Sequence, residues 1–256
     1  MEPAFVLLGL MVGALVGMTG VGAGSLVTPA LVFAGVPVPV AVGTDLAYAA
    51  ISKSAGALVH RSRRSLDLRI ALLLAAGSVP AAAIGVFVLA ASGAETRNAV
   101  IGAFLAAALI VAASVLLIGR ARVASFAARY ETRLAPWRRP LTIAAGALLG
   151  ALVALSSIGA GALGAAMLVA LHPAMPASRI AGTDIAHAVP LTLTAGIGHL
   201  WLGTVNWALA GNLLCGSIPG IVAGSLLCGR LDEGLVRRVL GGVLLLAGIR
   251  LALAGL

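Results

Sequence analysis

The sequence predicts an all-α membrane protein, a polytopic bundle of helices that cross the bilayer. Composition is the first reason, because 61% of the residues are hydrophobic and only 10% are charged, whereas soluble domains carry about 25% charged residues. The second reason is that apolar stretches of about twenty residues recur along the chain, which is the length of a membrane-crossing helix. They are rich in Ala and Leu and do not alternate with a period of two, which favours helices over strands. The third reason is that the same polar residues and glycines occur in both halves of the chain.

The apolar stretches give the order of the expected helices. Glycine-rich breaks at residues 20–25 and 158–161 separate two short segments from the helices before them, since glycine disfavours a continuous helix. The expected helical segments are residues 1–17, 26–34, 40–60, 70–91, 98–118, 141–155, 163–171, 180–200, 205–228 and 235–253.

The one extended polar stretch, residues 120–139, carries six arginines and predicts an amphipathic helix at the membrane interface. Arginine gathers in the short cytoplasmic loops of membrane proteins, and this explains the net charge of +9 without a nucleic-acid partner. The chain therefore divides into a first transmembrane repeat (1–119), a basic cytoplasmic linker (120–139) and a second transmembrane repeat (140–256).

The repeat is visible in polar residues. Residues 43–60 and 182–199 both begin Gly-Thr-Asp, and both place a His fifteen residues after the Asp. The same shift of 139 residues aligns the Gly-Ser-Val-Pro of residues 77–80 with the Gly-Ser-Ile-Pro of residues 216–219. Matching polar residues, glycines and a proline over such a length indicates a duplication.

The distribution of arginine predicts that the two repeats have opposite orientations in the membrane. The connection after residue 60 is rich in arginine and its counterpart at residues 200–206 has none, whereas the bias reverses at the next connection. Inverted repeats are typical of secondary transporters, with the site at their interface near the midplane. Inversion requires an odd number of crossings in each half, which three full spans would give, as would two half-helices that dip in and return plus one span. We favour the second arrangement, because about fifteen helical residues cover only about 22 Å of a 30 Å core.

Asp45 and Asp184 are the acidic residues of the repeated stretches, and each lies in a long apolar run. An intramembrane carboxylate is a functional-site candidate, and we expect both to take part in proton coupling. The alternative is that each caps the start of its helix, because each follows a threonine near a proline-broken segment.

Three histidines complete the expected proton-coupling set. His187 lies one turn after Asp184 on the same helix face. His60 and His199 lie about 22 Å along the helix from their own aspartates, so no dyad forms within one helix. The two histidines either pair across the repeats or anchor helix ends at the interface.

Lys53 is the single lysine of the chain and lies in the middle of a predicted span. It could neutralise Asp45, extend toward the membrane surface, or attract an anion.

The glycine breaks are candidate anion sites, because a short helix after such a break points backbone N–H groups into the membrane. The alternative is that glycine permits close helix packing. With Lys53, the expected substrate-binding residues are Gly22, Gly24, Ser25, Thr44, Gly159, Gly161 and Thr183.

At these residues the sequence resembles the sulfite exporter TauE/SafE family of membrane transporters. The matching pieces are Gly-Val-Gly-Ala-Gly-Ser at 20–25, Ala-Val-Gly-Thr-Asp-Leu at 41–46, Gly-Thr-Asp-Ile-Ala-His at 182–187, Val-Asn-Trp at 205–207 and Gly-Ser-Ile-Pro-Gly at 216–220. The resemblance covers essentially the whole chain and implies transport of a small anion such as sulfite, a sulfonate or a related organic acid. Ala23 and Ala160 interrupt the family's glycine triplet, and the family's Gly-x-Val-Asp-Trp motif is only partly kept.

We therefore expect a multi-pass transporter, exporter or permease of a bacterial-type plasma membrane, coupled to protons, whose partners are the small anion and the lipid bilayer. An uncoupled channel-like pore and an assembly factor stay open as alternatives, as does a homo-oligomer. An enzyme is not favoured, because Ser156 and Ser157 lie outside any nucleophile motif. No cofactor or metal motif is found, and Cys215 and Cys228 are expected in the core.

Overall fold

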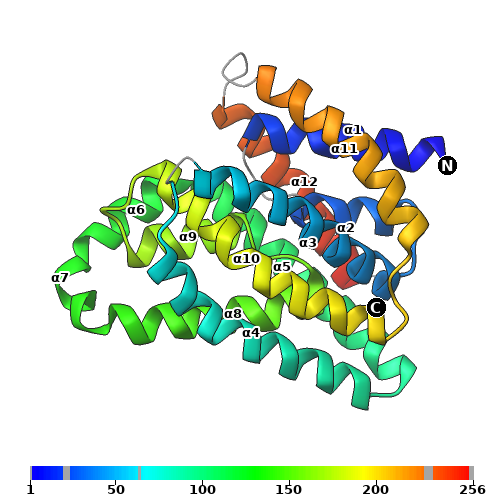
Figure 1. Ribbon diagram of the computed structural model, residues 1–256, viewed down its shortest axis with the longest axis horizontal. Coiled ribbons are helices and arrows are strands. Elements are labelled where there is room, and N and C mark those ends of the chain that lie inside the picture. Colours follow the sequence, from blue (N-terminus) through cyan, green and yellow to red (C-terminus); the bar gives the residue numbers. More distant parts are fainter. Residues whose placement is uncertain (1, 20–23, 63–64, 228–232, 254–256) are drawn as a thin grey trace.

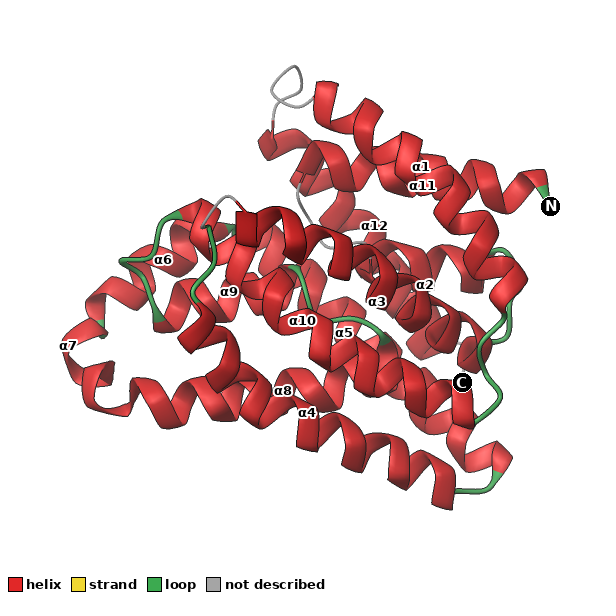
Figure 2. Cartoon of the chain, viewed as in Figure 1, coloured by secondary structure: helices red, strands yellow, loops and turns green. Residues whose placement is uncertain are grey.

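The computed structural model describes residues 2–19, 24–62, 65–227 and 233–253, and the regular elements of these ranges are all helical (Figure 2). The bundle is thus all-α, as the hydropathy pattern predicts. The helices are α1 (Pro3–Thr19), α2 (Gly24–Phe33), α3 (Val38–Ser62), α4 (Leu68–Ala91), α5 (Ala94–Ile118), α6 (Arg120–Arg129), α7 (Glu131–Leu134), the 3-10 turn Ala135–Trp137, α8 (Arg138–Ser156), α9 (Ala162–Leu171), α10 (Ala177–Trp201), α11 (Trp207–Leu227) and α12 (Glu233–Leu253).

Four stretches of the described chain are long and apolar enough to cross a membrane. They are Leu68–Ala91, Ala94–Ile118, Thr132–Ser156 and Trp207–Gly224. Helices α3 and α10 are as long but carry the polar residues of the repeated stretches. Large apolar side chains are exposed on the outside of the bundle, among them Leu72 and Phe87, which suits a lipid environment. Cys215 is also exposed, so its predicted place in the core is wrong, and Cys228 lies outside the described residues.

The helices pair across the chain rather than along it. Helix α1 packs against α11, α4 against α8, α5 against α12, and α3 against α10. Figure 1 shows α1 and α11 along one side of the bundle, α4 and α8 along the opposite side, and α3 with α10 between them. Each pair joins a helix from before the linker to one from after it, so the chain folds as one interlaced bundle.

Glycines set two of these interfaces. A Cβ on Gly77 of α4 would lie 1.9 Å from the carbonyl oxygen of Ile143 in α8, and a Cβ on Gly216 of α11 would lie 1.9 Å from that of Val6 in α1. Small residues allow helix backbones to approach closely in membranes, where apolar burial gives little driving force. Gly77 and Gly216 are separated by the same 139 residues as the two aspartates.

The two glycine-broken segments each return to the end of the bundle from which they start. The beginning of α1 and the turn after α2 line one cavity together, at Glu2, Phe5, Gly35 and Val36. The beginning of α8 meets the end of α9, where Thr142 Oγ1 lies 3.1 Å from His172 Nε2. One hairpin therefore opens at each end.

Arginine is concentrated at one end of the bundle, where α3, α5 and α9 end and α4, α8 and α10 begin. We call it the arginine-rich end. Its described arginines are Arg61, Arg69, Arg120, Arg122, Arg129, Arg133, Arg138, Arg139, Arg179, Arg237 and Arg238, and those of the opposite end are Arg97 and Arg250. Because basic residues mark the cytoplasmic side of short loops, we propose that this end faces the cytoplasm.

Candidate substrate site

The central helices α3 and α10 run antiparallel and bring the two repeated stretches together. A Cβ on Gly56 of α3 would lie 3.4 Å from Ile185 Cγ2 of α10, and one on Gly196 would lie 3.6 Å from the carbonyl carbon of Leu46. The start of each helix therefore lies beside the end of the other.

Asp45 and Asp184 lie inside these helices, seven residues after α3 begins at Val38 and α10 begins at Ala177. Their side chains are 0% and 4% exposed. An N-cap residue precedes the first helical turn, so the alternative in which the two aspartates cap their helices is wrong. Both carboxylates are instead enclosed in the middle of the bundle.

Asp45 meets both broken segments. Thr28 of α2 donates its hydroxyl to Asp45 Oδ2 at 2.5 Å. Ser157, which ends α8 in a left-handed conformation with φ 60, lies beside the same carboxylate. Ser157 Oγ and Asp45 Oδ1 do not reach hydrogen-bonding geometry, and both atoms are buried without a partner among the residues that the structure describes. Within the described part of the chain, only one of the two carboxylate oxygens is therefore hydrogen-bonded.

Asp184 lies against the second short helix. A Cβ on Gly164, in the first turn of α9, would overlap Asp184 Oδ1, so any larger residue there would displace the carboxylate. That oxygen is buried and has no hydrogen-bond partner among the described residues. Ala165 stands at the position of α9 that corresponds to Thr28 of α2, which explains why Asp184 has no threonine donor.

Lys53 of α3 reaches across to the second half of the chain. Its ammonium donates to the carbonyl oxygen of Ala160 at 2.8 Å. Its charge acts on Asp184 most strongly and on Asp45 second, although it forms no direct ion pair with either in the described part of the chain. An ammonium has three donor hydrogens, and one of them is used by Ala160.

The turn that receives Lys53 depends on glycine. Gly159 has φ +143 and Gly161 has φ +134, values that side chains with a Cβ rarely adopt. Gly161 immediately precedes α9. The first-half counterpart is described only from Gly24, which begins α2, with Ser25 buried beside it; the predicted site residue Gly22 lies outside the described residues.

His187 and Tyr48 occupy equivalent places on α10 and α3, three residues after the aspartates. His187 Nε2 lies 2.9 Å from the hydroxyl of Ser78 in α4. Tyr48 lies beside Ser217 of α11, but its hydroxyl does not reach hydrogen-bonding geometry. The electrostatic effect of Lys53 extends to His187, so this histidine belongs to the same central cluster.

Buried polar atoms without a partner gather at this centre. Native structures satisfy nearly all such atoms, so a group of them calls for an explanation. In the described part of the chain the central ones are Asp45 Oδ1, Tyr48 Oη, Ser157 Oγ, Asp184 Oδ1 and His187 Nδ1.

A comparison with protein families matches residues 5–251 to the family described as Sulfite exporter TauE/SafE. The chain belongs to the sulfite exporter TauE/SafE family. It is also 38% identical over 255 residues to the probable membrane transporter protein YjnA of Bacillus subtilis (strain 168), which covers 98% of this chain and all of that protein. No solved structure matches it. As a TauE/SafE protein it is a multi-pass membrane transporter and not an enzyme.

In this TauE/SafE transporter two of the candidate histidines lie away from the carboxylates. His60 Nδ1 lies 2.8 Å from Ser65 Oγ, and His199 Nδ1 lies 2.9 Å from Thr204 Oγ1. His199 Nε2 is also 2.9 Å from the carbonyl oxygen of Ala154. Both rings hold the loop that follows their helix, and neither bonds to an aspartate in the part of the chain that the structure describes.

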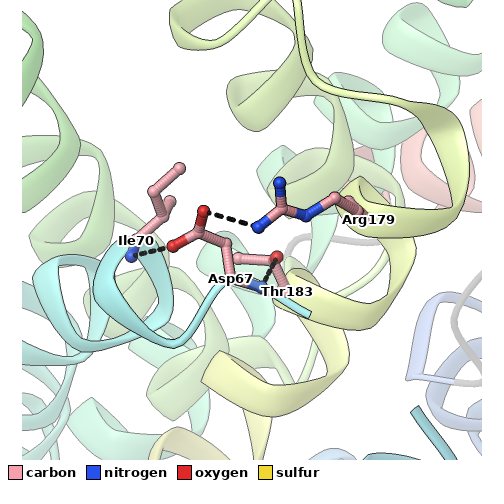
Figure 3. A network of polar contacts seen from close by, with 4 residues as sticks. All are labelled: Asp67, Ile70, Arg179 and Thr183. Atoms are coloured by element: carbon pink, nitrogen blue, oxygen red, sulfur yellow. Dashed lines mark hydrogen bonds and ion pairs between the residues drawn. The ribbon is translucent and has the colours of Figure 1, made fainter. Parts of the chain in front are cut away.

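The two candidate threonines bind backbone rather than the centre. Thr183 Oγ1 accepts the backbone N–H of Asp67 at 2.8 Å (Figure 3), and Thr44 Oγ1 accepts that of Asn206 at 3.0 Å. Each threonine thus holds a loop of the opposite half.

Sequence reasoning missed Thr28, Ser78 and Ser157 as members of the centre. Thr28 and Ser78 are isolated polar residues in apolar helices. Such residues can be recognised from the sequence as candidate members of a buried site. Ser157 lies outside any nucleophile motif, and its place beside Asp45 has no signal in the sequence.

Proposed function

We propose that this transporter moves a small anion, such as sulfite, a sulfonate or a related organic acid, and couples it to protons. The observation that carries the proposal is the Lys53 ammonium, which lies among buried polar groups and, among the described residues, has donor hydrogens left over beyond its bond to Ala160. An oxoanion accepts several hydrogen bonds, and charge-assisted bonds are the stronger ones. Ser157 and the N-terminal turn of α9 supply further donors beside it.

Charge balance supports coupling to protons. With both carboxylates ionised, Asp45, Asp184 and Lys53 carry a net charge of minus one, which disfavours a second anion. A proton on either carboxylate removes this repulsion. Proton binding and anion binding then favour each other, and such coupling is reciprocal. We therefore infer that the anion and the proton cross in the same direction.

His187 is the histidine best placed to exchange protons with this centre, since its Nδ1 is buried and has no partner among the described residues. His60 and His199 would act through the loops that they hold. We assign the anion to Lys53 and the glycine turns, and the proton to Asp45 and Asp184.

We also infer that the two halves are inverted repeats that enclose this centre. Reciprocal contacts support this: Thr44 accepts the backbone N–H of Asn206, and Thr183 accepts that of Asp67. The shift of 139 residues that relates the two halves turns Thr44 into Thr183 and Asp67 into Asn206. The hairpins of broken helices opening at opposite ends support it too. Inverted repeats place the substrate near the midplane, where the two carboxylates lie.

The test is flux of sulfite and of sulfoacetate into proteoliposomes with an imposed pH gradient. The wild type is expected to accumulate the anion on the alkaline side. Lys53→Met is expected to lower flux about tenfold or more, the loss of a charge-assisted bond. Asp45→Asn and Asp184→Asn are expected to remove the dependence on pH, while Glu95→Gln, at an exposed carboxylate, leaves it intact.

Two results would contradict the proposal. Flux that ignores the gradient in the wild type would favour an uncoupled pore. Equal flux in Lys53→Met and in the wild type would show that the anion does not bind at Lys53.

A further inference from the structure

Two short loops close the ends of the α3–α10 pair with the same contacts. Asp67 binds Thr183 at the arginine-rich end and Asn206 binds Thr44 at the other, each through its backbone N–H. The side-chain oxygen of each loop residue also accepts the backbone N–H three residues on, at 3.2 Å for Asp67 and 3.0 Å for Asn206. The two ends are alike in every one of these hydrogen bonds.

The ends differ in one ion pair. Arg179 Nη2 lies 3.1 Å from Asp67 Oδ2 (Figure 3). At the opposite end the corresponding residues are Val40 and Asn206, which cannot form a charged pair. Val40 and Asn206 instead line a cavity of about 490 Å³. Of these two corresponding pairs, the charged one therefore lies at the arginine-rich end.

We propose that the Asp67–Arg179 ion pair is a latch that closes the arginine-rich end of the route to the central carboxylates. It rests on the proposed function, in which the anion binds at Lys53 and the proton at Asp45 and Asp184. The latch ties the loop before α4 to the first turn of α10, and Thr183 in the same network directly precedes Asp184. The two side chains are 46% and 24% exposed, so the pair is weak enough to break in each transport cycle.

The corresponding residues at the opposite end of the bundle indicate which substitutions are conservative. Asn206 shows that asparagine at this loop position keeps both the helix cap and the backbone bond, so Asp67→Asn removes only the charge. Val40 shows that valine is accommodated at the position of Arg179, so Arg179→Val is its partner variant. The double variant Val40→Arg with Asn206→Asp installs the same pair at the opposite end.

Accessibility of a central cysteine measures which end is open. Ser157→Cys, in a chain with Cys215→Ala and Cys228→Ala, is labelled with a membrane-impermeant methanethiosulfonate from either side of oriented vesicles. Asp67→Asn and Arg179→Val are each expected to raise the ratio of labelling from the arginine-rich side to labelling from the opposite side by about 1.5-fold to fivefold, the range given by exposed ion pairs.

The reciprocal variants make the test specific. Val40→Arg with Asn206→Asp is expected to lower the same ratio, and the charge exchange Asp67→Arg with Arg179→Asp to return it toward the starting value. If the pair only stabilises the fold, breaking it would lower the thermal midpoint and raise labelling from both sides alike. That result overturns the latch. An unchanged ratio overturns it as well.

The labelling also separates the latch from the proposed function. Labelling that reaches Ser157→Cys but ignores the latch variants overturns the latch alone. Labelling from neither side in any variant excludes a water-filled route to this centre, and that result overturns both.

Discussion

Thr44 and Thr183 are fully buried, and each hydroxyl is the acceptor for a backbone N–H of the opposite half. Thr44→Val and Thr183→Val keep the shape but leave that N–H without its acceptor. We expect each to lower the free energy of unfolding by about 1–3 kcal/mol, the cost of a buried unsatisfied donor. Thermal unfolding in detergent measures the loss.

Thr44→Ser and Thr183→Ser are the matched controls, because serine keeps the hydroxyl. A valine variant as stable as its serine counterpart would show that the backbone bond contributes nothing.

His172 gives a pH dependence outside the apolar spans. Burial holds the pKa of His172 below its usual 6.5, nearby Arg138 lowers it further, and Asp67 opposes both. The unfolded chain then takes up a proton before the folded protein does, so stability falls as the pH drops below about 6.5. We expect the thermal midpoint of the wild type to fall more between pH 7.5 and 5.5 than that of His172→Gln. Equal falls would contradict this.

At the scale of single residues the sequence predicted the charged members of the centre and missed their partners. Asp45, Asp184 and Lys53 are conspicuous because charge is rare in apolar segments. The bond from Thr28 to Asp45 depends on how α2 packs on α3, which no spacing along one helix reveals. For the same reason the threonines expected at the centre proved to hold loops.

Helices α4 and α11 rest on their partners through glycine. Gly77→Ala and Gly216→Ala would place a methyl group against a carbonyl oxygen. We expect each to destabilise the protein by about 1–3 kcal/mol, as overpacking does. Thermal unfolding in detergent is again the measurement.

Gly211→Ala is the control in α11, since no atom lies within 4 Å of a Cβ there. It is expected to be neutral or to stabilise by up to about 1 kcal/mol through helix propensity. A loss in Gly211→Ala equal to that in Gly216→Ala would refute the packing explanation.

Helix positions were predictable because hydropathy and glycine or proline breaks mark them directly. The observed α4 begins at Leu68 and ends at Ala91, within two residues of the expected segment. The partners of each helix were not predictable, since α1 could pack on any apolar face. The only sequence signal for the pairing of helices was the spacing of 139 residues between Gly77 and Gly216, which pack against α8 and α1.

The distribution of arginine predicts how the whole molecule is oriented in the membrane. We expect Ser125→Cys in α6 to react with an impermeant maleimide from the cytoplasmic side and Ala94→Cys at the start of α5 from the opposite side, in the chain without its native cysteines. Both residues are exposed. Labelling of intact cells and of inverted vesicles distinguishes them, and reaction of both from one side would contradict the assignment.

Binding of an anion at Lys53 is the claim on which the transport proposal depends. It is tested most directly by the thermal midpoint of purified protein with and without sulfite, sulfoacetate and a carboxylate of equal size. An anion at a hundred times its Kd is expected to stabilise the wild type by about 2.7 kcal/mol and to leave Lys53→Met at its own starting midpoint. Equal stabilisation of the wild type and Lys53→Met would contradict the claim.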